Sequence, residues 1–306
     1  MKAITVTDRS EPAGAARLDE RPDPHAAEND VVVEVRAAGF TPGELAWPAT
    51  WTDRAGRDRT PSIPGHELAG VVTSLGYGTT GLSIGQRVFG FADWARDGTL
   101  AEYVSVEARN LAPLPADIDF VTAASLPISG LTAWQGLLQH GRLQVGQTVL
   151  ITGPAGGVGT VAVQLAREAG AFVVGAGRSL HRERALEAGV HAFVDTDGDW
   201  SAVAGGVDLV FDVVGGEVGR RAAGFVRDGG TLVTIVEPPQ ATRPGITAVF
   251  FVVEPDRRQL VDLARRLREG TLRTFVGDVV TLADAAAVFG SRSTGQGKTI
   301  VRVGDD

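Results

Sequence analysis

Short runs rich in β-strand-forming apolar residues follow one another from Lys2 to about Asp117. Glycine and proline separate these runs, and this spacing predicts a compact, barrel-like β domain. In chain order the runs are KAITVT, DVVVEVRAAG, ELAGVVTSLG, QRVFGF and LAEYVSV. Residues 49–64 are polar, charged and bounded by proline, so we expect them to form a surface loop.

The period changes after Asp117, where apolar residues recur at intervals of three and four and predict helix, which Pro127 should divide in two. From Gln147 onward, strand-length apolar runs alternate with helix-length segments. Six strands with helices after the first, second and fourth predict a parallel sheet covered on both faces, which is a doubly wound fold. The strand runs are TVLITG, AFVVGAG, HAFVD, VDLVFDVVG, TLVTIV and ITAVFFVV.

The end of the chain resembles its beginning. An amphipathic helix is predicted from Pro255 to Glu269, and the final strand KTIVRV has the period of the N-terminal region, so we expect the C-terminus to rejoin the first domain. A chain of 306 residues also exceeds the usual size of a single core. We therefore predict an α/β protein with a β-rich domain formed by 1–118 and 254–306 and a doubly wound domain formed by 119–253.

A glycine-rich turn joins the strand TVLITG to the helix of PAGGVGTVAVQLAREAG, a context that predicts dinucleotide binding. Gly153 would permit a tight exit from the strand, and Gly159 would let the helix pack closely. Gly156, Gly157 and the adjoining Val158 would bring backbone close to a diphosphate, which the helix N-terminus attracts. The alternative is a flexible surface turn.

The end of the next strand distinguishes NADH from NADPH, because NAD-binding folds place a carboxylate there for the ribose 2′-hydroxyl. No acid stands at 175–177; Arg178 follows directly, with Arg182 one helical turn further. A guanidinium can bind the 2′-phosphate through two hydrogen bonds. The sequence therefore predicts NADPH, unless Arg178 is only a solvent-facing residue at a helix start.

The charge and residue content of the chain argue against several classes of binding partner and catalytic site. A formal charge of −8 and a pI near 5.2 argue against nucleic acid, which requires a clustered cationic face. The absence of cysteine excludes thiolate catalysis and cysteine-based zinc sites. Neither the N-terminus nor any later run has the apolar length of a signal peptide or membrane helix, so we expect a cytoplasmic protein without a membrane partner.

Seven stretches spread over nearly the whole chain carry a family resemblance. They are RAAGFTPGEL (36–45), IPGHELAGVV (63–72), IGQRVFGF (84–91), AASLPISGLTAWQGL (123–137), VLITGPAGGVGTVAVQLA (149–166), FDVVGG (211–216) and GKTIVRV (297–303). In this order they resemble the medium-chain dehydrogenase/reductase superfamily, and within it the zinc-independent NADPH:quinone oxidoreductase (zeta-crystallin-like) group. The resemblance implies a GroES-like catalytic domain built from both ends of the chain, an inserted Rossmann domain and a cofactor in the cleft.

The same resemblance bears on zinc, because zinc-dependent relatives carry cysteine where this chain has Thr41 and Ser129. Only His66 and Glu67 of the GHE motif remain between those positions. Hydroxyls are poor replacements for thiolates, so we expect no catalytic metal. His66 then has two interpretations: a hydrogen-bond donor that faces substrate, or a buried histidine that holds the GHE turn.

Without a metal to polarise an alcohol, reduction of a quinone or an α,β-unsaturated carbonyl compound is the easier chemistry. Hydride can pass from the nicotinamide C4 to the electrophilic carbon, and water can supply the proton. We therefore predict an NADPH-dependent reductase of one of these substrates. The alternatives are a nonenzymatic NADPH-binding protein on the same fold and, as a weaker option, a zinc alcohol dehydrogenase.

Further site residues are implied only by the resemblance. Thr41, where many quinone oxidoreductases have Asn, and Thr132 would lie near the nicotinamide and its phosphate, whereas Thr196 replaces a tyrosine near the adenosine end in some relatives. Lys298 matches a position that faces the cofactor. Five residues fall at strand ends that line the family's cleft, although each is equally consistent with core: Val214, Ile235, Val236, Phe250 and Phe251.

Three tryptophans, Trp47, Trp51 and Trp94, fall in predicted loops of the first domain, where an aromatic acceptor would stack. The alternative is that they cover the core beneath them. The resemblance further implies a homodimer, with ITAVFFVV (246–253) as a candidate contact, because an exposed apolar strand edge invites pairing.

Overall fold

The computed structural model describes residues 1–41, 43–239, 243–290 and 297–304, without the side chains at 289 and 290. It divides into two compact units. The β-rich unit comprises 1–128, 255–269 and 275–306, and the parallel-sheet unit comprises 129–254 and 270–274. The β-rich unit extends beyond residue 118 because helix α2 (Phe120–Ala124) packs on the sheet of that unit.

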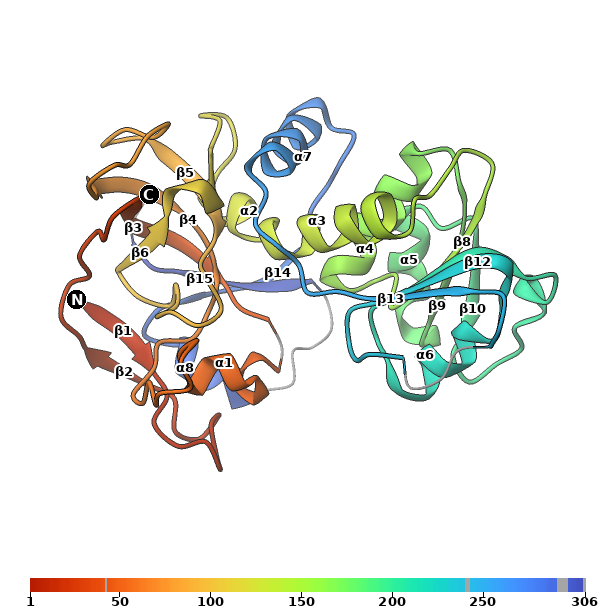
Figure 1. Ribbon diagram of the computed structural model, residues 1–306, viewed down its shortest axis with the longest axis horizontal. Helices are drawn as coiled ribbons and strands as arrows, with labels where there is room; N and C mark the ends of the chain where they lie inside the picture. The colour runs from red at the N-terminus through yellow and green to blue at the C-terminus, as the bar shows by residue number, and fades with distance from the viewer. Residues whose placement is uncertain (42, 240–242, 291–296, 305–306) are drawn as a thin grey trace. The chain divides into compact units, whose positions relative to one another are not determined.

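A mixed sheet forms the β-rich unit, with strand order β14-β15-β3-β4-β5-β7 and β6 paired to β3; β1 and β2 form a separate antiparallel pair. The strands are β1 (Lys2–Thr5), β2 (Arg17–Glu20), β3 (Asp30–Gly39), β4 (Glu67–Leu75), β5 (Arg87–Phe91), β6 (Tyr103–Glu107), β7 (Leu111–Pro113), β14 (Val276–Thr281) and β15 (Lys298–Arg302). Near the chain's end, β15 runs antiparallel to β3 (Figure 1). A strand near the end of the chain thus lies in the same sheet as the N-terminal strand β3.

Helices interrupt the connections of the β-rich unit. Besides α2 they are α1 (Pro48–Trp51), α7 (Arg257–Glu269), α8 (Ala285–Gly290) and the short turns η1 (Glu44–Ala46) and η2 (Ala108–Asn110). The prediction that 49–64 is loop throughout was wrong at its start. Pro48 lies in the first turn of α1. Backbone N–H groups have no hydrogen-bond partner within the helix at this position, so the N–H that proline lacks is not missed. Burial of Trp51 against Val6 and Leu45 stabilises that turn.

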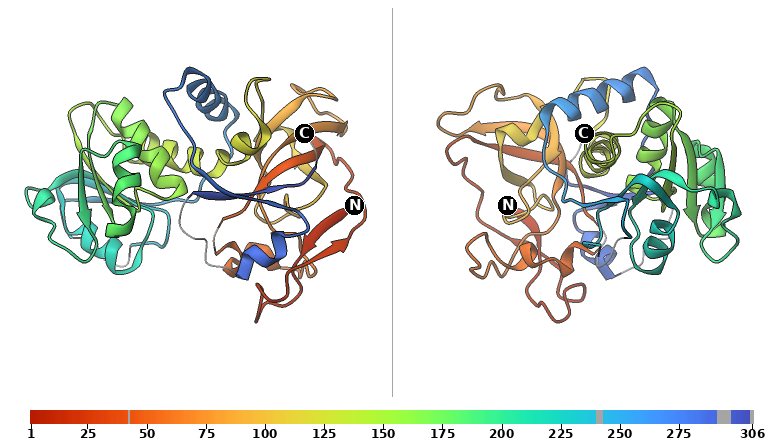
Figure 2. Two further views of the ribbon diagram at one scale, coloured as in Figure 1. Left: turned by 180° about the vertical axis from the view of Figure 1, so that it is seen from behind. Right: turned by 45° about the vertical axis from the view of Figure 1, so that its right-hand side comes forward.

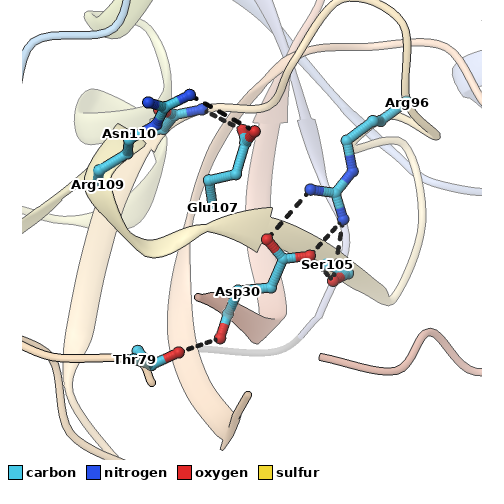
Figure 3. A network of polar contacts seen from close by, with 7 residues as sticks. All are labelled: Asp30, Thr79, Arg96, Ser105, Glu107, Arg109 and Asn110. Atoms are coloured by element: carbon cyan, nitrogen blue, oxygen red, sulfur yellow. Dashed lines mark hydrogen bonds and ion pairs between the residues drawn. The ribbon is translucent and has the colours of Figure 1, made fainter. Parts of the chain in front are cut away.

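A buried ion pair between Asp30 and Arg96 links β3 to the segment that follows β5 (Figure 3). Asp30 opens β3 with its side chain 3% exposed, and Arg96 donates to both carboxylate oxygens, at 3.2 and 2.5 Å. Ser105 donates to the same carboxylate at 3.1 Å, and Thr79 donates to the Asp30 carbonyl at 2.7 Å. A buried charge must be paired and hydrogen-bonded to be tolerated, and Asp30 meets both conditions.

The parallel-sheet unit contains the six predicted strands in the order β10-β9-β8-β11-β12-β13, and every pairing is parallel. Their bounds are β8 (Thr148–Thr152), β9 (Phe172–Gly177), β10 (Ala192–Asp195), β11 (Val207–Asp212), β12 (Val226–Thr234) and β13 (Thr247–Phe250). The chain proceeds outward from β8 in one direction and from β11 in the other, so the order reverses between these neighbours. This confirms the doubly wound, Rossmann-type fold.

Helices cover both faces of this sheet (Figure 2). They are α3 (Pro127–Trp134), the π-helical η3 (Gln135–His140), α4 (Gly157–Glu168), η4 (Ser179–His181), α5 (Arg182–Ala188), η5 (Ser201–Val203) and α6 (Gly216–Ala223). Along β11, Phe211 contacts Gly136 of η3, whereas Val210 on the opposite face packs with Ala222 of α6. No helix among the described residues has the length and apolar character to cross a membrane.

Candidate cofactor and active site

The glycine-rich turn lies between the carboxyl end of β8 and the start of α4. Gly153 has φ +61°, in the left-handed region, and its amide donates to the Ala176 carbonyl at 2.8 Å. A Cβ on Gly159 would lie 2.0 Å from the Gly153 carbonyl oxygen, so only glycine permits this approach. Gly156 is the N-cap, and no described side chain caps the helix. The first amides of α4, from Gly157 through Gly159, are therefore available to an anion.

Apolar side chains gather beside this turn. Val214 lies against Gly153, with its Cγ2 2.9 Å from where a Cβ on Gly153 would stand. Val236 lies against Gly215, with its Cγ1 2.6 Å from the corresponding Cβ position. Val214 and Val236 are 48% and 45% exposed, and half-buried Ile235 precedes Val236. The structure thus brings these three predicted residues together at the carboxyl edge of the sheet.

Other predicted cofactor residues of this unit lie apart from that group. Phe250, at the end of β13, is 38% exposed, whereas Phe251 is buried with its ring centroid 4.5 Å from that of His140. Thr132 is buried within α3, and Ser129, earlier in the same helix, has its hydroxyl 3.1 Å from a Cβ position on Gly157. Phe251 and Thr132 therefore have mainly buried surroundings.

A cationic cluster follows β9. Arg178 comes directly after the strand, is exposed and donates to Nε2 of His181 at 3.1 Å. Arg182 is also exposed, and its guanidinium lies 5.8 Å from the ring centroid of Phe193. Burial, followed by the charges of Arg178 and Arg184, lowers the pKa of His181. The amide of Thr196, after β10, donates to the Gly177 carbonyl at 3.0 Å, so both strand ends meet here.

In the β-rich unit the GHE motif is buried. Glu67 opens β4 with no exposed surface, forms an ion pair with Lys298 of β15 and accepts the Ile128 amide at 2.8 Å. His66 is 3% exposed, and its Nδ1 has no hydrogen-bond partner among the described residues. Burial, followed by the charge of Arg59, lowers the pKa of His66 to about 3. The imidazole is therefore neutral at neutral pH.

Glu44 was not predicted as a site residue, yet it connects two site loops. Its side chain is buried, Oε2 accepts the Thr41 amide at 3.0 Å and Oε1 accepts the Gly65 amide at 2.7 Å. Burial raises its pKa to about 7, with Glu67 adding to the rise while the two amides and Lys298 oppose it. Glu44 thereby fixes half-exposed Thr41 relative to the GHE turn.

Aromatic rings surround His66. Trp47 stacks on it with centroids 6.4 Å apart, Trp94 meets it edge-on at 4.9 Å, and the two indoles lie 5.4 Å apart. Trp51 lies elsewhere: it is 2% exposed, and its indole nitrogen donates to the Leu45 carbonyl at 2.8 Å. The structure therefore groups Trp47 and Trp94 with His66 and gives Trp51 a covering position in the core.

The described residues contain no group of three or more His, Asp or Glu side chains arranged to hold a metal ion.

Two family models match the chain: the alcohol dehydrogenase GroES-like domain over residues 27–116 and the zinc-binding dehydrogenase over residues 157–256. These regions fall in the β-rich unit and, for the second, almost wholly in the parallel-sheet unit.

Individual proteins are also similar to this chain in sequence or in structure. The 2-methylene-furan-3-one reductase of Solanum lycopersicum is 31% identical over 83% of this chain and 65% of its own length. The chloroplastic NADPH-dependent alkenal/one oxidoreductase of Arabidopsis thaliana is 32% identical over 83% of this chain and 66% of its own. The chain thus spans about two thirds of the length of these relatives. The solved structure of the quinone oxidoreductase from Coxiella burnetii superimposes with a TM-score of 0.89, 26% identity and 99% coverage of both chains.

Glu44 and His66 should have opposite effects on the pH dependence of stability. The pKa of Glu44 is raised from 4.5 to about 7, so its contribution to stability is present below pH 4.5 and is lost as the pH rises through 7. The pKa of His66 is lowered from 6.5 to about 3, so its contribution is present above pH 6.5 and is lost as the pH falls toward 3. Between pH 4.5 and 6.5 each group changes the free energy of unfolding by about 1.4 kcal/mol per pH unit, and because the two changes have opposite signs they offset each other.

Glu44→Gln removes one of the two slopes. Its melting temperature should then rise between pH 4.5 and 6.5 much more steeply than that of the wild type, and the matched His66→Gln variant should fall over the same interval. Thermal unfolding at constant ionic strength measures both. Parallel curves for the wild type and Glu44→Gln would contradict the assignment.

Proposed function

The chain belongs to the medium-chain dehydrogenase/reductase superfamily, in its quinone-oxidoreductase-like group, and from that membership we propose that it transfers hydride from NADPH to a quinone or an α,β-unsaturated carbonyl compound. One observation carries the proposal: a glycine turn opens α4 at the carboxyl edge of a parallel sheet, and the next strand is followed directly by arginine rather than by an acid. The first feature suits a dinucleotide and the second its 2′-phosphate.

In this proposal the amides of Gly157, Val158 and Gly159 bind the diphosphate, because the helix start combines unpaired donors with the positive end of the helix dipole. The exposed apolar surfaces of Val214 and Val236 beside the turn suit the uncharged parts of the cofactor. Ile235, Phe250, Phe251, Thr132, Thr196 and Lys298 keep the cofactor roles implied by the family resemblance, as part of the same proposal.

NADPH is preferred over NADH because Arg178 and Arg182 present two exposed guanidinium groups after β9, and the strand end lacks the carboxylate that would repel a phosphate. The name of the Arabidopsis relative, an NADPH-dependent alkenal/one oxidoreductase, supports this preference.

The acceptor is placed by analogy with relatives whose names specify an enone, an alkenal or a quinone. Bound NADPH supplies the hydride that reduces the electrophilic carbon. Neutral His66 and the Thr41 hydroxyl are assigned to hydrogen-bond the acceptor oxygen as negative charge develops there, and water supplies the proton. Trp47 and Trp94 provide aromatic surface for a planar acceptor.

The proposed reaction requires no catalytic zinc. Thr41 and Ser129 offer hydroxyls where zinc enzymes of the family use thiolates, and hydroxyls are weak zinc ligands. Both oxygens of Glu67 are also occupied, one by the ammonium of Lys298 and the other by the Ile128 amide. Binding zinc through Glu67 would break a buried ion pair.

Purified protein should oxidise NADPH when given members of a panel of quinones and enones, with one product molecule per nucleotide. The decrease in absorbance at the nicotinamide band measures this rate, and prior dialysis against EDTA should leave it unchanged. Binding of NADPH, followed by fluorescence, without turnover of any acceptor would favour a nonenzymatic sensor instead. Loss of activity in EDTA that zinc restores would favour the zinc enzyme.

Arg178→Ala should raise the dissociation constant of NADPH about 10- to 100-fold, because a hydrogen bond between charged groups contributes about 1.5 to 3 kcal/mol. NADH lacks the 2′-phosphate, so its dissociation constant should change less than twofold. Arg220→Ala, an exposed arginine on α6, serves as the matched control and should leave both constants unchanged. Equal weakening of NADPH and NADH by Arg178→Ala would refute the 2′-phosphate assignment.

We also propose a homodimer formed through β13. This strand is outermost in its sheet, pairs only with β12 among the described strands, and is followed by Val252, which is 59% exposed. Sedimentation should give twice the 31.9 kDa of one chain, and Val252→Glu should shift the protein toward monomer because it places charge on the apolar edge. A monomeric wild type at micromolar concentration would exclude this interface.

A further inference from the structure

The order of the parallel sheet reverses between β8 and β11, and ligands of such sheets bind outside the carboxyl ends of the strands at this point. The last residues of the two strands are Thr152 and Asp212. Asp212 is 4% exposed, which is unusual for a carboxylate outside an ion pair. Its surroundings explain how it is tolerated there.

Asp212 joins the ends of three adjacent strands. The Thr152 hydroxyl, at the end of β8, donates to Oδ1 at 2.7 Å, and the Thr234 hydroxyl, at the end of β12, donates to Oδ2 at 3.3 Å. The Thr152 hydroxyl also accepts the Val213 amide at 2.9 Å. These contacts hold the carboxyl edge together across the reversal of strand order.

The same carboxylate shapes the turn that follows β11. Oδ1 accepts the amides of Val214 and Gly215 at 3.2 and 3.0 Å, and Gly215 adopts φ +73° to complete the turn. A Cβ on Gly219 of α6 would lie 2.4 Å from Oδ2, so a glycine there lets the helix approach. The turn places Val214 against Gly153 of the phosphate-binding turn.

We infer that Asp212 is a positioning residue for the dinucleotide: it holds the Val214 turn and the ends of β8 and β12 in the arrangement that receives the cofactor. It does so through Thr152, Thr234 and two backbone amides. The inference rests on the proposed function, since it requires the dinucleotide to bind at this edge.

Charge alone predicts the opposite effect of removing this carboxylate. NADPH is an anion, so loss of a nearby negative charge would strengthen its binding if electrostatic repulsion dominated. Loss of positioning would weaken it, because asparagine keeps one accepting oxygen and turns an NH2 group toward the donors of the other. Those donors are the Thr234 hydroxyl at Oδ2, or the Thr152 hydroxyl and two backbone amides at Oδ1. The sign of the change therefore separates the two effects.

Asp212→Asn tests the inference, and Asp208→Asn is its matched control. Asp208 lies at the other end of β11, where its carboxylate likewise bridges to β8 by accepting the Thr148 amide at 2.7 Å. Each variant loses one negative charge and one carboxylate oxygen on β11, and Asp208→Asn also loses the ion pair of Asp208 with Arg227 of β12. Only Asp212 lies at the carboxyl edge.

We expect Asp212→Asn to raise the NADPH dissociation constant at least ~10-fold, measured below the melting temperature of every variant, because small misplacements at a binding site are costly. The KM for NADPH should rise in parallel. The kcat at saturating nucleotide should stay within about threefold, because the residues assigned to the acceptor, His66 and Thr41, are unchanged. Asp208→Asn should change the dissociation constant less than twofold, even where it lowers the melting temperature equally.

Unchanged or tighter NADPH binding by Asp212→Asn, or equal weakening by both variants, would overturn the inference while leaving the proposed function intact. A wild type that binds no nicotinamide nucleotide would instead remove the proposed function itself. If Asp212→Asn does not fold, Thr152→Val takes its place and should raise the NADPH dissociation constant at least about fivefold, because it loses two hydrogen bonds, one to Asp212 and one from the Val213 amide. Its control is Thr148→Val, since Thr148 bonds Asp208 through its backbone; equal constants for these two variants would also overturn the inference.

Discussion

The close approach between Gly159 and the Gly153 carbonyl is the constraint on which the parallel-sheet unit's edge depends. A Cβ would lie 2.0 Å from that oxygen, so α4 can begin directly behind β8 only with glycine at this position. The first amides of α4 then open at the carboxyl edge, where the helix dipole favours an anion. The roles proposed for Asp212 and Arg178 depend on this helix start, because both residues are assigned to the dinucleotide whose diphosphate would bind there.

The β-rich unit has a comparable joint in the ion pair of Glu67 with Lys298. It connects the GHE turn to the strand that returns from the far end of the chain. Removing one partner of such a buried pair costs about 3 to 5 kcal/mol, because the other charge is left uncompensated. Glu44 adds a second link, since it holds Thr41 to the same turn. The proposed acceptor-binding residues are thus fixed by buried carboxylates.

Local pattern was sufficient for the elements and the fold class. The six strands of the parallel sheet are apolar enough to be recognised individually, and the glycine spacing located the turn before α4. Pattern failed at α1, because the burial of Trp51 against Val6 and Leu45 depends on tertiary structure. Site residues identified through resemblance, such as Thr132 and Lys298, came from matching motifs rather than from physical derivation.

Long-range partners were beyond the reach of the sequence. Asp212 and Thr152 are 60 residues apart, and Lys298 and Glu67 are 231 apart, so no periodicity connects them. The acid that ends the buried run VDLVFD was a usable signal, because an unpaired carboxylate is rarely buried. Similarly, the grouping of His66 with Trp47 and Trp94 required three loops to meet in space.

The central claim is that a dinucleotide's diphosphate binds the amides that open α4. Amide NMR spectra recorded during titration with NADPH test it most directly. The account predicts saturable shifts of the Gly157, Val158 and Gly159 resonances at submillimolar nucleotide. Spectra in which these three resonances stay unmoved at millimolar NADPH would contradict it.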